Sequence, residues 1–220
     1  QIKEAAEKIK KSKNPIIISG GGDFYSNAME ELSNFATKHN IPVTQTVMGY
    51  STMKRDHSHY AGQIGGLGGK NTNDLAKETD LAIAVGTKLA DFTTGSWANF
   101  ENEKFKLVSI NVSRFDANKH LAQAVVGDAK VSLIELSKAL GDWKVGDEWN
   151  EKSQRELKIW NEHIDKESAP TNQEVPSYVQ VIGAIYRNSE PTDIAVTAAG
   201  GLVGEVVQVW RKETKQSLQR

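Results

Sequence analysis

The chain has 220 residues, a formal net charge of −1 and no cysteine. This length allows one full hydrophobic core and leaves a remainder too short for a second domain of ordinary size. The balanced charge argues against a nucleic-acid partner, and the lack of cysteine excludes disulfides and thiolate metal sites. The sequence has no apolar stretch of membrane-spanning length and no signal-peptide pattern. We therefore expect a soluble, cytoplasmic protein.

Short apolar runs alternate with amphipathic segments over the first 141 residues. Runs bounded by glycine, proline or polar residues predict buried strands, and apolar side chains at intervals of three and four predict helices. The predicted strands are residues 15–19, 41–46, 81–85, 105–112 and 124–128. The predicted helices are residues 2–11, 27–39, 71–77 and 130–140. This alternation predicts an α/β fold, a doubly wound parallel sheet over residues 13–141, after an incoming linker helix over residues 1–12.

The strand at residues 81–85 ends in glycine and leads into a loop rich in hydroxyl side chains. Ligands of open α/β sheets bind at the carboxyl ends of strands, where glycine allows close approach and hydroxyls can bind phosphate or sugar. A tight turn with solvated hydroxyls explains the same residues. The candidate nucleotide crevice, vestigial in our interpretation, consists of Gly86, Thr87, Lys88, Thr94, Gly95 and Ser96.

Three consecutive glycines, residues 20–22, follow the first strand. Such a loop before a helix can cradle a pyrophosphate. The spacing is not G-x-G-x-x-G, however, and the next strand ends in Gln45 and Thr46 instead of an acidic residue. We interpret these glycines as a connecting loop.

A long stretch without a clear pattern, residues 48–70, follows the second strand, and such loops are usually functional or mobile. It contains His57 and His59 at a spacing that suits two metal ligands, but no third ligand lies close by in sequence. We expect His57 to hold the loop by hydrogen bonds and predict no metal site. No G-x-S-x-G elbow or carboxylate pair occurs, so we predict no catalytic residue in this chain.

The last third of the chain differs in character. Residues 142–176 predict a linker that runs into an exposed helix, and residues 177–188 predict a helix with a broad apolar face. Residues 193–201 predict a buried strand with a glycine-rich exit, followed by a helix from residue 202. One strand and its helices cannot bury both faces of a sheet. We therefore interpret residues 177–220 as the truncated start of a second α/β domain that packs back onto the first or against a partner.

Several motifs occur in the order found in one enzyme family. They are Met48-Gly49, Asp56-His57, Tyr60, Gly62, Gly65, Asn71, Asn73, Asp80-Leu81, Val85-Gly86-Thr87-Lys88-Leu89, Thr94-Gly95, Ile110-Asn111-Val112, Asn118-Lys119 and Val126-Gly127-Asp128. Together they resemble the central domain of thiamine-diphosphate-dependent enzymes related to acetolactate synthase. Such enzymes have three α/β domains, so the resemblance implies that residues 177–220 open the third one. It also implies thiamine diphosphate and Mg²⁺ in a full-length parent, with the diphosphate bound at Ala199, Gly200, Gly201 and Leu202.

Residues 91–97 and 197–210 resemble the branch of this family that opens a cyclic diketone by hydrolysis in myo-inositol breakdown. An acetolactate-synthase-like carboligase or decarboxylase is the nearest alternative, and a module that binds FAD or ADP is another. Flavin-binding relatives carry an arginine in the loop after Gly86, where this chain has Phe92. The resemblance therefore argues against structural FAD.

The same resemblance places the catalytic glutamate in the first domain of the family and the magnesium motif later in the third. Neither is present in this chain, so we expect it to be inactive on its own, with a chiefly structural role for residues 13–141. The cofactor of such enzymes lies between domains of neighbouring subunits. We therefore expect the parent to be a homo-oligomer, a dimer or a tetramer.

Overall fold

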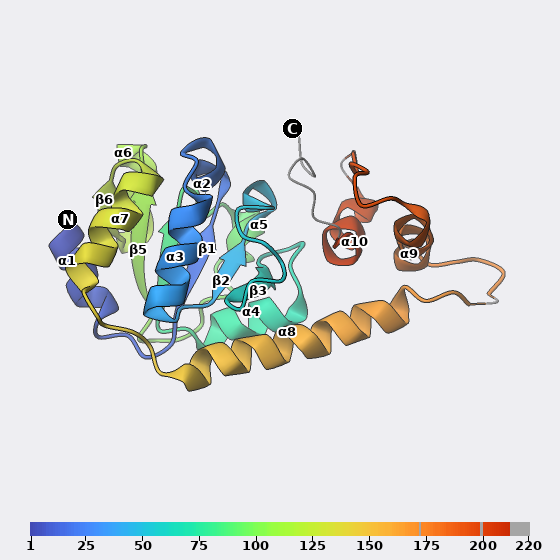
Figure 1. Ribbon diagram of the computed structural model, residues 1–220, viewed down its shortest axis with the longest axis horizontal. Coiled ribbons are helices and arrows are strands. Elements are labelled where there is room, and N and C mark those ends of the chain that lie inside the picture. Colours follow the sequence, from blue (N-terminus) through green and yellow to red (C-terminus); the bar gives the residue numbers. More distant parts are fainter. Residues whose placement is uncertain (172, 199, 212–220) are drawn as a thin grey trace.

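The computed structural model describes residues 1–171, 173–198 and 200–211, and its centre is a six-stranded parallel sheet with the order β3-β2-β1-β4-β5-β6 (Figure 1). The strands are β1 (Pro15–Ser19), β2 (Val43–Gln45), β3 (Tyr60–Gln63), β4 (Leu81–Val85), β5 (Lys106–Asn111) and β6 (Gln123–Val126). Strand order reverses between β1 and β4, which pair from Pro15 with Leu81 to Ser19 with Val85. The predicted doubly wound α/β fold is confirmed, and ligands of such sheets bind at this reversal point.

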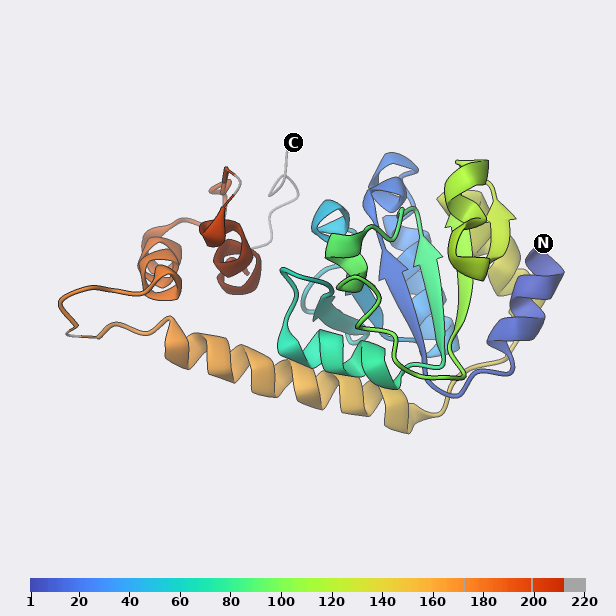
Figure 2. The same cartoon turned by 180° about the vertical axis from the view of Figure 1, so that it is seen from behind.

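Helices cover the sheet on both sides (Figures 1 and 2). Helix α7 packs against both α1 and α3, and α4 and α8 lie together beside β3. No described helix is both long enough and apolar enough to cross a lipid bilayer. The helices are α1 (Ile2–Ile9), α2 (Gly21–Tyr25), α3 (Met29–His39), η1 (Val47–Gly49), α4 (Lys70–Glu78), α5 (Asp91–Thr94), α6 (Arg114–Ala117), η2 (Lys119–Leu121), α7 (Ala129–Leu140), α8 (Asp147–Glu167), α9 (Tyr178–Asn188) and α10 (Gly201–Val209).

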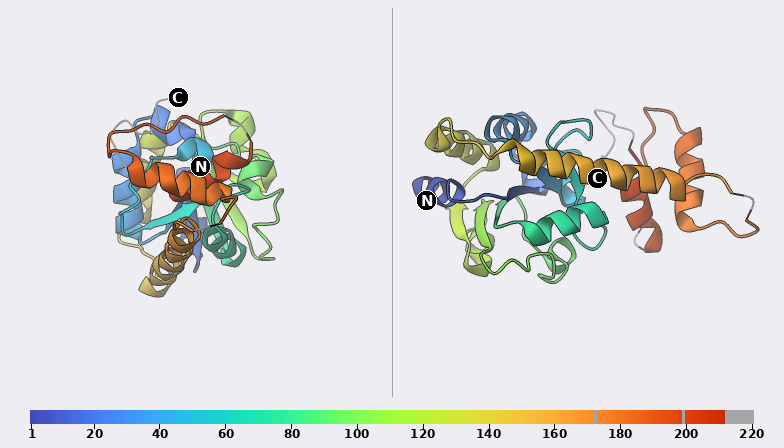
Figure 3. Two further views of the ribbon diagram at one scale, coloured as in Figure 1. Left: turned by 90° about the vertical axis from the view of Figure 1, so that its right-hand side faces the viewer. Right: turned by 90° about the horizontal axis from the view of Figure 1, so that it is seen from below.

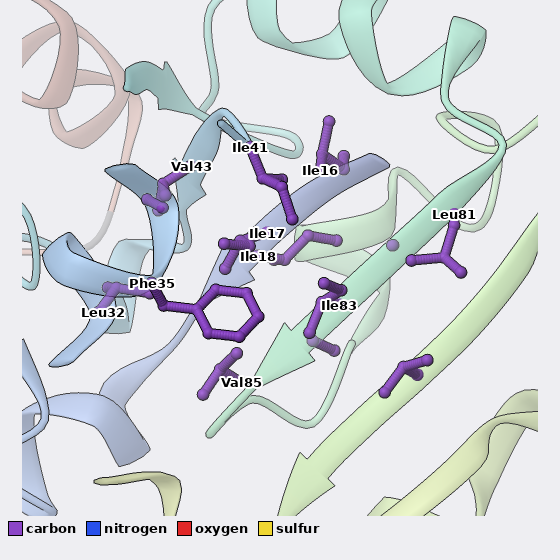
Figure 4. Packing of buried hydrophobic residues seen from close by; sticks show 14 of the residues in the cluster. Ile16, Ile17, Ile18, Leu32, Phe35, Ile41, Val43, Leu81, Ile83 and Val85 are labelled. Atoms are coloured by element: carbon purple, nitrogen blue, oxygen red, sulfur yellow. The ribbon is translucent and has the colours of Figure 1, made fainter. Parts of the chain in front are cut away.

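The central strands are buried on both faces, as their uninterrupted apolar sequences predict. All residues of β1 and β4 are buried. Figure 4 shows Ile17, Ile83 and Phe35 of α3 in one packed cluster. Full burial of one such side chain contributes roughly 1.5–3 kcal/mol, so this cluster fixes β1 and β4 where the strand order reverses.

The helix expected within residues 142–176 is α8, which extends from the sheet domain to α9 and α10 (Figure 3). Its inner side is buried instead of exposed. Trp149 and Leu157 belong to the main core, and Trp149 Nε1 donates a hydrogen bond to Pro15 O at 2.8 Å. The apolar stripe of α8, although thin, is therefore enough to attach it to the sheet domain. The division of the chain into domains stays a prediction.

Several short elements were not predicted: η1, α5, α6 and η2, and also β3 and α2, which lie near the reversal point or pair with the sheet. Strand β3 lies inside the stretch interpreted as irregular, because Tyr-Ala-Gly-Gln has no run of branched apolar residues and pairs with β2 through a register shift after Val43. Helix α2 begins at Gly21 within the glycine loop, and Asn27, with φ of 52°, separates it from α3. Both elements are short and depend on tertiary contacts.

The strand predicted for residues 193–201 is wrong, since residues 193–198 form no strand and Ile194 and Val196 are 42% and 87% exposed. A strand requires a neighbouring strand for its backbone hydrogen bonds, and no described strand lies beside this segment. The helices predicted on either side of it are confirmed as α9 and α10.

Candidate functional site

The loops that leave β1 and β4 contact each other at the reversal point. The Gly20 amide donates to Val85 O at 2.9 Å, and the Gly22 amide donates to Gly86 O at 2.9 Å. A Cβ at Gly22 would lie 2.5 Å from Gly86 Cα, so this close approach requires glycine. Both amides are bonded within the chain and are not available to a pyrophosphate, which agrees with a connecting loop.

Three of the six crevice candidates are engaged by the chain itself. Gly86 has φ of 60° and is packed against the glycine loop. Thr87 O accepts a hydrogen bond from Asn111 Nδ2 at 3.1 Å. Thr94 is fully buried, and its Oγ1 accepts from the Trp97 amide at 3.3 Å. The hydroxyl of Thr94 is therefore not presented to a ligand.

The other three candidates lie on the outer part of the same loop. Gly95 ends α5 with φ of 58°, and Lys88 and Ser96 are exposed. Phe92, at the position where the resemblance implies an arginine in flavin-binding relatives, is 71% exposed. Its carbonyl accepts from the Gly66 amide at 2.7 Å. Lys88 and Ser96 are thus the exposed members of the candidate set.

Asp23 of α2 is fully buried beside Gly86, and no sequence motif marks it as a site residue. Its Oδ2 lies 2.5 Å from Ser19 Oγ, which lies 2.6 Å from Thr52 Oγ1. Thr52 Oγ1 donates to Gly49 O at 2.7 Å. Burial raises the pKa of Asp23 to about 8, against the smaller opposing effect of the Ser19 hydrogen bond, and Oδ1 has no hydrogen-bond partner among the described residues. Asp23 is therefore a neutral acid at pH 7.

The Ser19 hydroxyl donates to Asp23 Oδ2 and also contacts Thr52 Oγ1, which donates to Gly49 O. The hydrogen bond from Ser19 does not offset the effect of burial on the carboxyl group. The sequence signal for this group is an acidic residue just after a glycine-rich strand exit, and that signal does not reveal burial.

The two histidines hold the loop before β3, as predicted for His57. His57 Nδ1 accepts from the His59 amide at 3.1 Å, and His59 Nε2 lies 2.9 Å from Asn40 Oδ1. Burial lowers the pKa of both histidines. Within residues 1–171, 173–198 and 200–211, no group of three or more His, Asp or Glu side chains could hold a metal ion.

The residues assigned to a diphosphate lie at the start of α10. Gly200, Gly201 and Leu202 line a hollow of about 750 Å³ between α9, residues 193–198 and α10, and Ala199 lies outside the described residues. Gly200 has φ of 132°, no side chain among the described residues caps α10, and the first turn of α10 has no acidic residue. Uncapped amides at a helix N-terminus attract anions. This donor set fits a diphosphate, whereas ligands for Mg²⁺ have to come from elsewhere.

An open six-stranded parallel sheet with this order, with glycine-rich loops at its reversal point, is typical of nucleotide-binding-like α/β domains. Residues 2–136 match the family described as "Thiamine pyrophosphate enzyme, central domain". Because the match covers more than half of the chain, the chain belongs to this family of thiamine pyrophosphate enzymes.

The chain is also similar to enzymes named 3D-(3,5/4)-trihydroxycyclohexane-1,2-dione hydrolase. The Clostridium perfringens enzyme (strain 13) is 32% identical over 99% of this chain and 38% of its own length. The Clostridium tetani enzyme is 34% identical over 95% of this chain and 36% of its own length. An enzyme of Bacillus cereus whose name ends in "hydrolase 2" is 44% identical over 61% of this chain and 21% of its own length. The chain thus spans little more than a third of the relatives that match nearly all of it.

Proposed function

We propose that this chain is part of a thiamine-diphosphate- and Mg²⁺-dependent hydrolase that opens the ring of trihydroxycyclohexane-1,2-dione by carbon–carbon bond cleavage in myo-inositol catabolism. The observation that carries the proposal is the shared name of relatives that align with 95–99% of the chain, the start of α10 included. Those relatives are far longer, so the activity is assigned to a full-length enzyme and this chain alone is expected to be inactive.

Within that enzyme, Gly200, Gly201 and Leu202, together with Ala199, bind the diphosphate of the cofactor. The described amides lie at the N-terminus of α10, where the helix dipole favours negative charge. Thiamine diphosphate supplies an electron sink that stabilises a carbanion. The sheet domain spaces the catalytic domains and contributes to a homo-oligomer, and a cytoplasmic location stays a prediction.

Two alternatives belong to other reaction or protein classes. The first is a carboligase or decarboxylase related to acetolactate synthase, which shares the fold and the cofactor. The second is a module that binds FAD or ADP at the exit of β4. The intrachain bonds of the Gly20 and Gly22 amides and the phenylalanine at position 92 weigh against the second alternative.

The substrate assay that tests the proposal compares two ketones on the full-length enzyme. With thiamine diphosphate and Mg²⁺ present, we expect ring opening of the cyclic dione, followed by NMR, and no acetolactate or acetaldehyde from pyruvate. Turnover of pyruvate with no turnover of the dione would reject the proposal in favour of the first alternative.

A further inference from the structure

Helix α10 packs against α9, and hydrogen bonds at its carboxyl-terminal end attach it to the sheet domain. Arg55 Nη2 donates to Val207 O at 2.7 Å, and Tyr50 OH donates to Trp210 O at 2.7 Å. Gln208 adds a bond of 2.7 Å to the loop after β3. Trp210 is 6% exposed. The carboxyl-terminal end of α10 therefore packs back onto the first domain, as expected, whereas Ile194 and Val196 of the same segment are exposed.

Arg55 supplies a charge that α10 lacks. Carbonyl groups at a helix C-terminus have no intrahelical partner and carry partial negative charge. The last turn of α10 has no basic residue of its own. Arg55 lies 5.1 Å from the ring centroid of Tyr50 and 5.9 Å from that of Tyr60, which restrict its position. A cation from the loop between η1 and β3 thus faces the negative end of α10.

The amino-terminal end of α10 is open by comparison. A Cβ at Gly200 would meet no atom within 4 Å, and one at Gly201 would meet the ring of Tyr178 at 3.4 Å. Backbone hydrogen bonds keep the length of a nine-residue helix at about 13 Å. The position of its fixed end therefore determines where the first amides lie.

We infer that Arg55 and Tyr50 are positioning residues for the diphosphate loop and act on it through α10. This inference rests on the proposed function, because it requires the start of α10 to bind the cofactor. Backbone amides bind an anion well only when a rigid element holds them in one direction. Loss of either bond removes no amide from the loop, but it weakens the attachment of the carboxyl-terminal end of α10. The effect is on cofactor affinity and not on the chemical step.

The first test measures hydrogen exchange in this chain with Arg55→Met and Tyr50→Phe. Loss of a charged hydrogen bond to a carbonyl should speed exchange of the α10 amides about tenfold and leave β4 unchanged. Arg155→Met, on the exposed side of α8, and Tyr25→Phe, 76% exposed, are matched controls without an effect on α10. Unchanged exchange of α10 in Arg55→Met would overturn the inference.

The second test measures the dissociation constant of thiamine diphosphate by calorimetry on the full-length enzyme. Arg55→Met should raise it about tenfold, with kcat at saturating cofactor unchanged. Arg55→Lys keeps the cation and should stay within about threefold of the wild type. Faster exchange with an unchanged dissociation constant would show a purely structural contact and overturn the inference. A wild-type enzyme that does not bind the cofactor would instead reject the proposed function, and this assignment with it.

Discussion

Ser19 Oγ and Asp23 Oδ2 lie 2.5 Å apart where the strand order of the sheet reverses. The Ser19 hydroxyl donates to Asp23 and contacts Thr52 Oγ1, which donates to Gly49 O. These contacts join the end of β1 to the turn after η1, the same loop that continues to Arg55. An acid that is neutral only in the folded state makes the free energy of unfolding depend on pH.

The free energy of unfolding should fall as pH rises from about 4 to 8. The pKa of Asp23 is about 8 in the folded chain against a reference of 3.8. Below pH 3.8 Asp23 is protonated in both the folded and the unfolded state. Between pH 3.8 and about 8 only the folded state keeps the proton, so each pH unit lowers the free energy of unfolding by up to about 1.4 kcal/mol. Asp23→Asn cannot ionise and should remove this slope, as measured by urea unfolding at pH 5 and pH 8.

Asp128→Asn is the matched control, because this carboxylate has the opposite shift. The hydrogen bond from Ser26 and then the Val131 amide lower the pKa of Asp128. Its contribution is present above the unfolded pKa and disappears as pH falls through the folded one. The control should therefore lower the free energy of unfolding by a constant amount between pH 5 and pH 8, leave the slope in this range unchanged, and alter the pH dependence only on the acid side. Equal slopes for wild type and Asp23→Asn between pH 5 and pH 8 would contradict a neutral Asp23.

Gly22→Ala should destabilise the sheet domain. The added methyl group would lie 2.5 Å from Gly86 Cα, which is backbone and cannot rotate away. Overpacking of this kind costs about 1–3 kcal/mol, and thermal unfolding measures it. Gly146→Ala, with φ of −59° and no atom within 4 Å, should cost less than about 1 kcal/mol. Equal melting temperatures for the two variants would show that the loops after β1 and β4 can move apart to accommodate the methyl group.

The sequence predicts the centre of the sheet well, because β1 and β4 are uninterrupted runs such as Ile16-Ile17-Ile18 that suit burial on both faces. It does not predict β3, whose four residues become a strand only by pairing with β2. The opposite error occurs at residues 193–198, where the pattern of a buried strand is present but the described part of the chain places no strand beside it. In both cases long-range pairing decides the structure.

The candidate sites show the same dependence on packing. Thr94 has the right chemistry for phosphate, but its hydroxyl faces the interior. Asp23 is one acidic residue among many in the sequence, and its burial follows from the packing of α2 against η1, α3 and α7. Tyr50 and Arg55 contact residues about 150 positions away in sequence, with separations of 160 and 152. Local spacing cannot show any of these relationships.

Residues 193–198 should exchange their amide hydrogens rapidly in this chain. They form no strand, and Ile194 and Val196 are exposed, so few contacts protect their amides. The β4 amides, in a buried strand, serve as the internal reference. We expect protection of residues 193–198 to appear only in the full-length enzyme. Protection equal to that of β4 in a dilute, monomeric sample of this chain would refute the expectation.

Titration of this chain with FAD and with ADP should give no saturable binding in the micromolar range. The glycine amides near β4 are bonded internally, and Phe92 offers no charge for a phosphate. Calorimetry measures binding directly. A micromolar isotherm that is lost in Lys88→Met, the exposed cation among the crevice candidates, would establish a functional nucleotide site there instead of a vestigial one.

Cofactor dependence of ring opening in the full-length enzyme tests the central claim most directly. NMR would follow trihydroxycyclohexane-1,2-dione with the enzyme stripped of cofactor, with thiamine diphosphate and Mg²⁺ restored, and with this 220-residue chain alone. We predict one ring-opened product per substrate consumed in the restored enzyme, and none in the stripped enzyme or with the chain alone. Ring opening that is unaffected by removal and restoration of thiamine diphosphate would contradict the account.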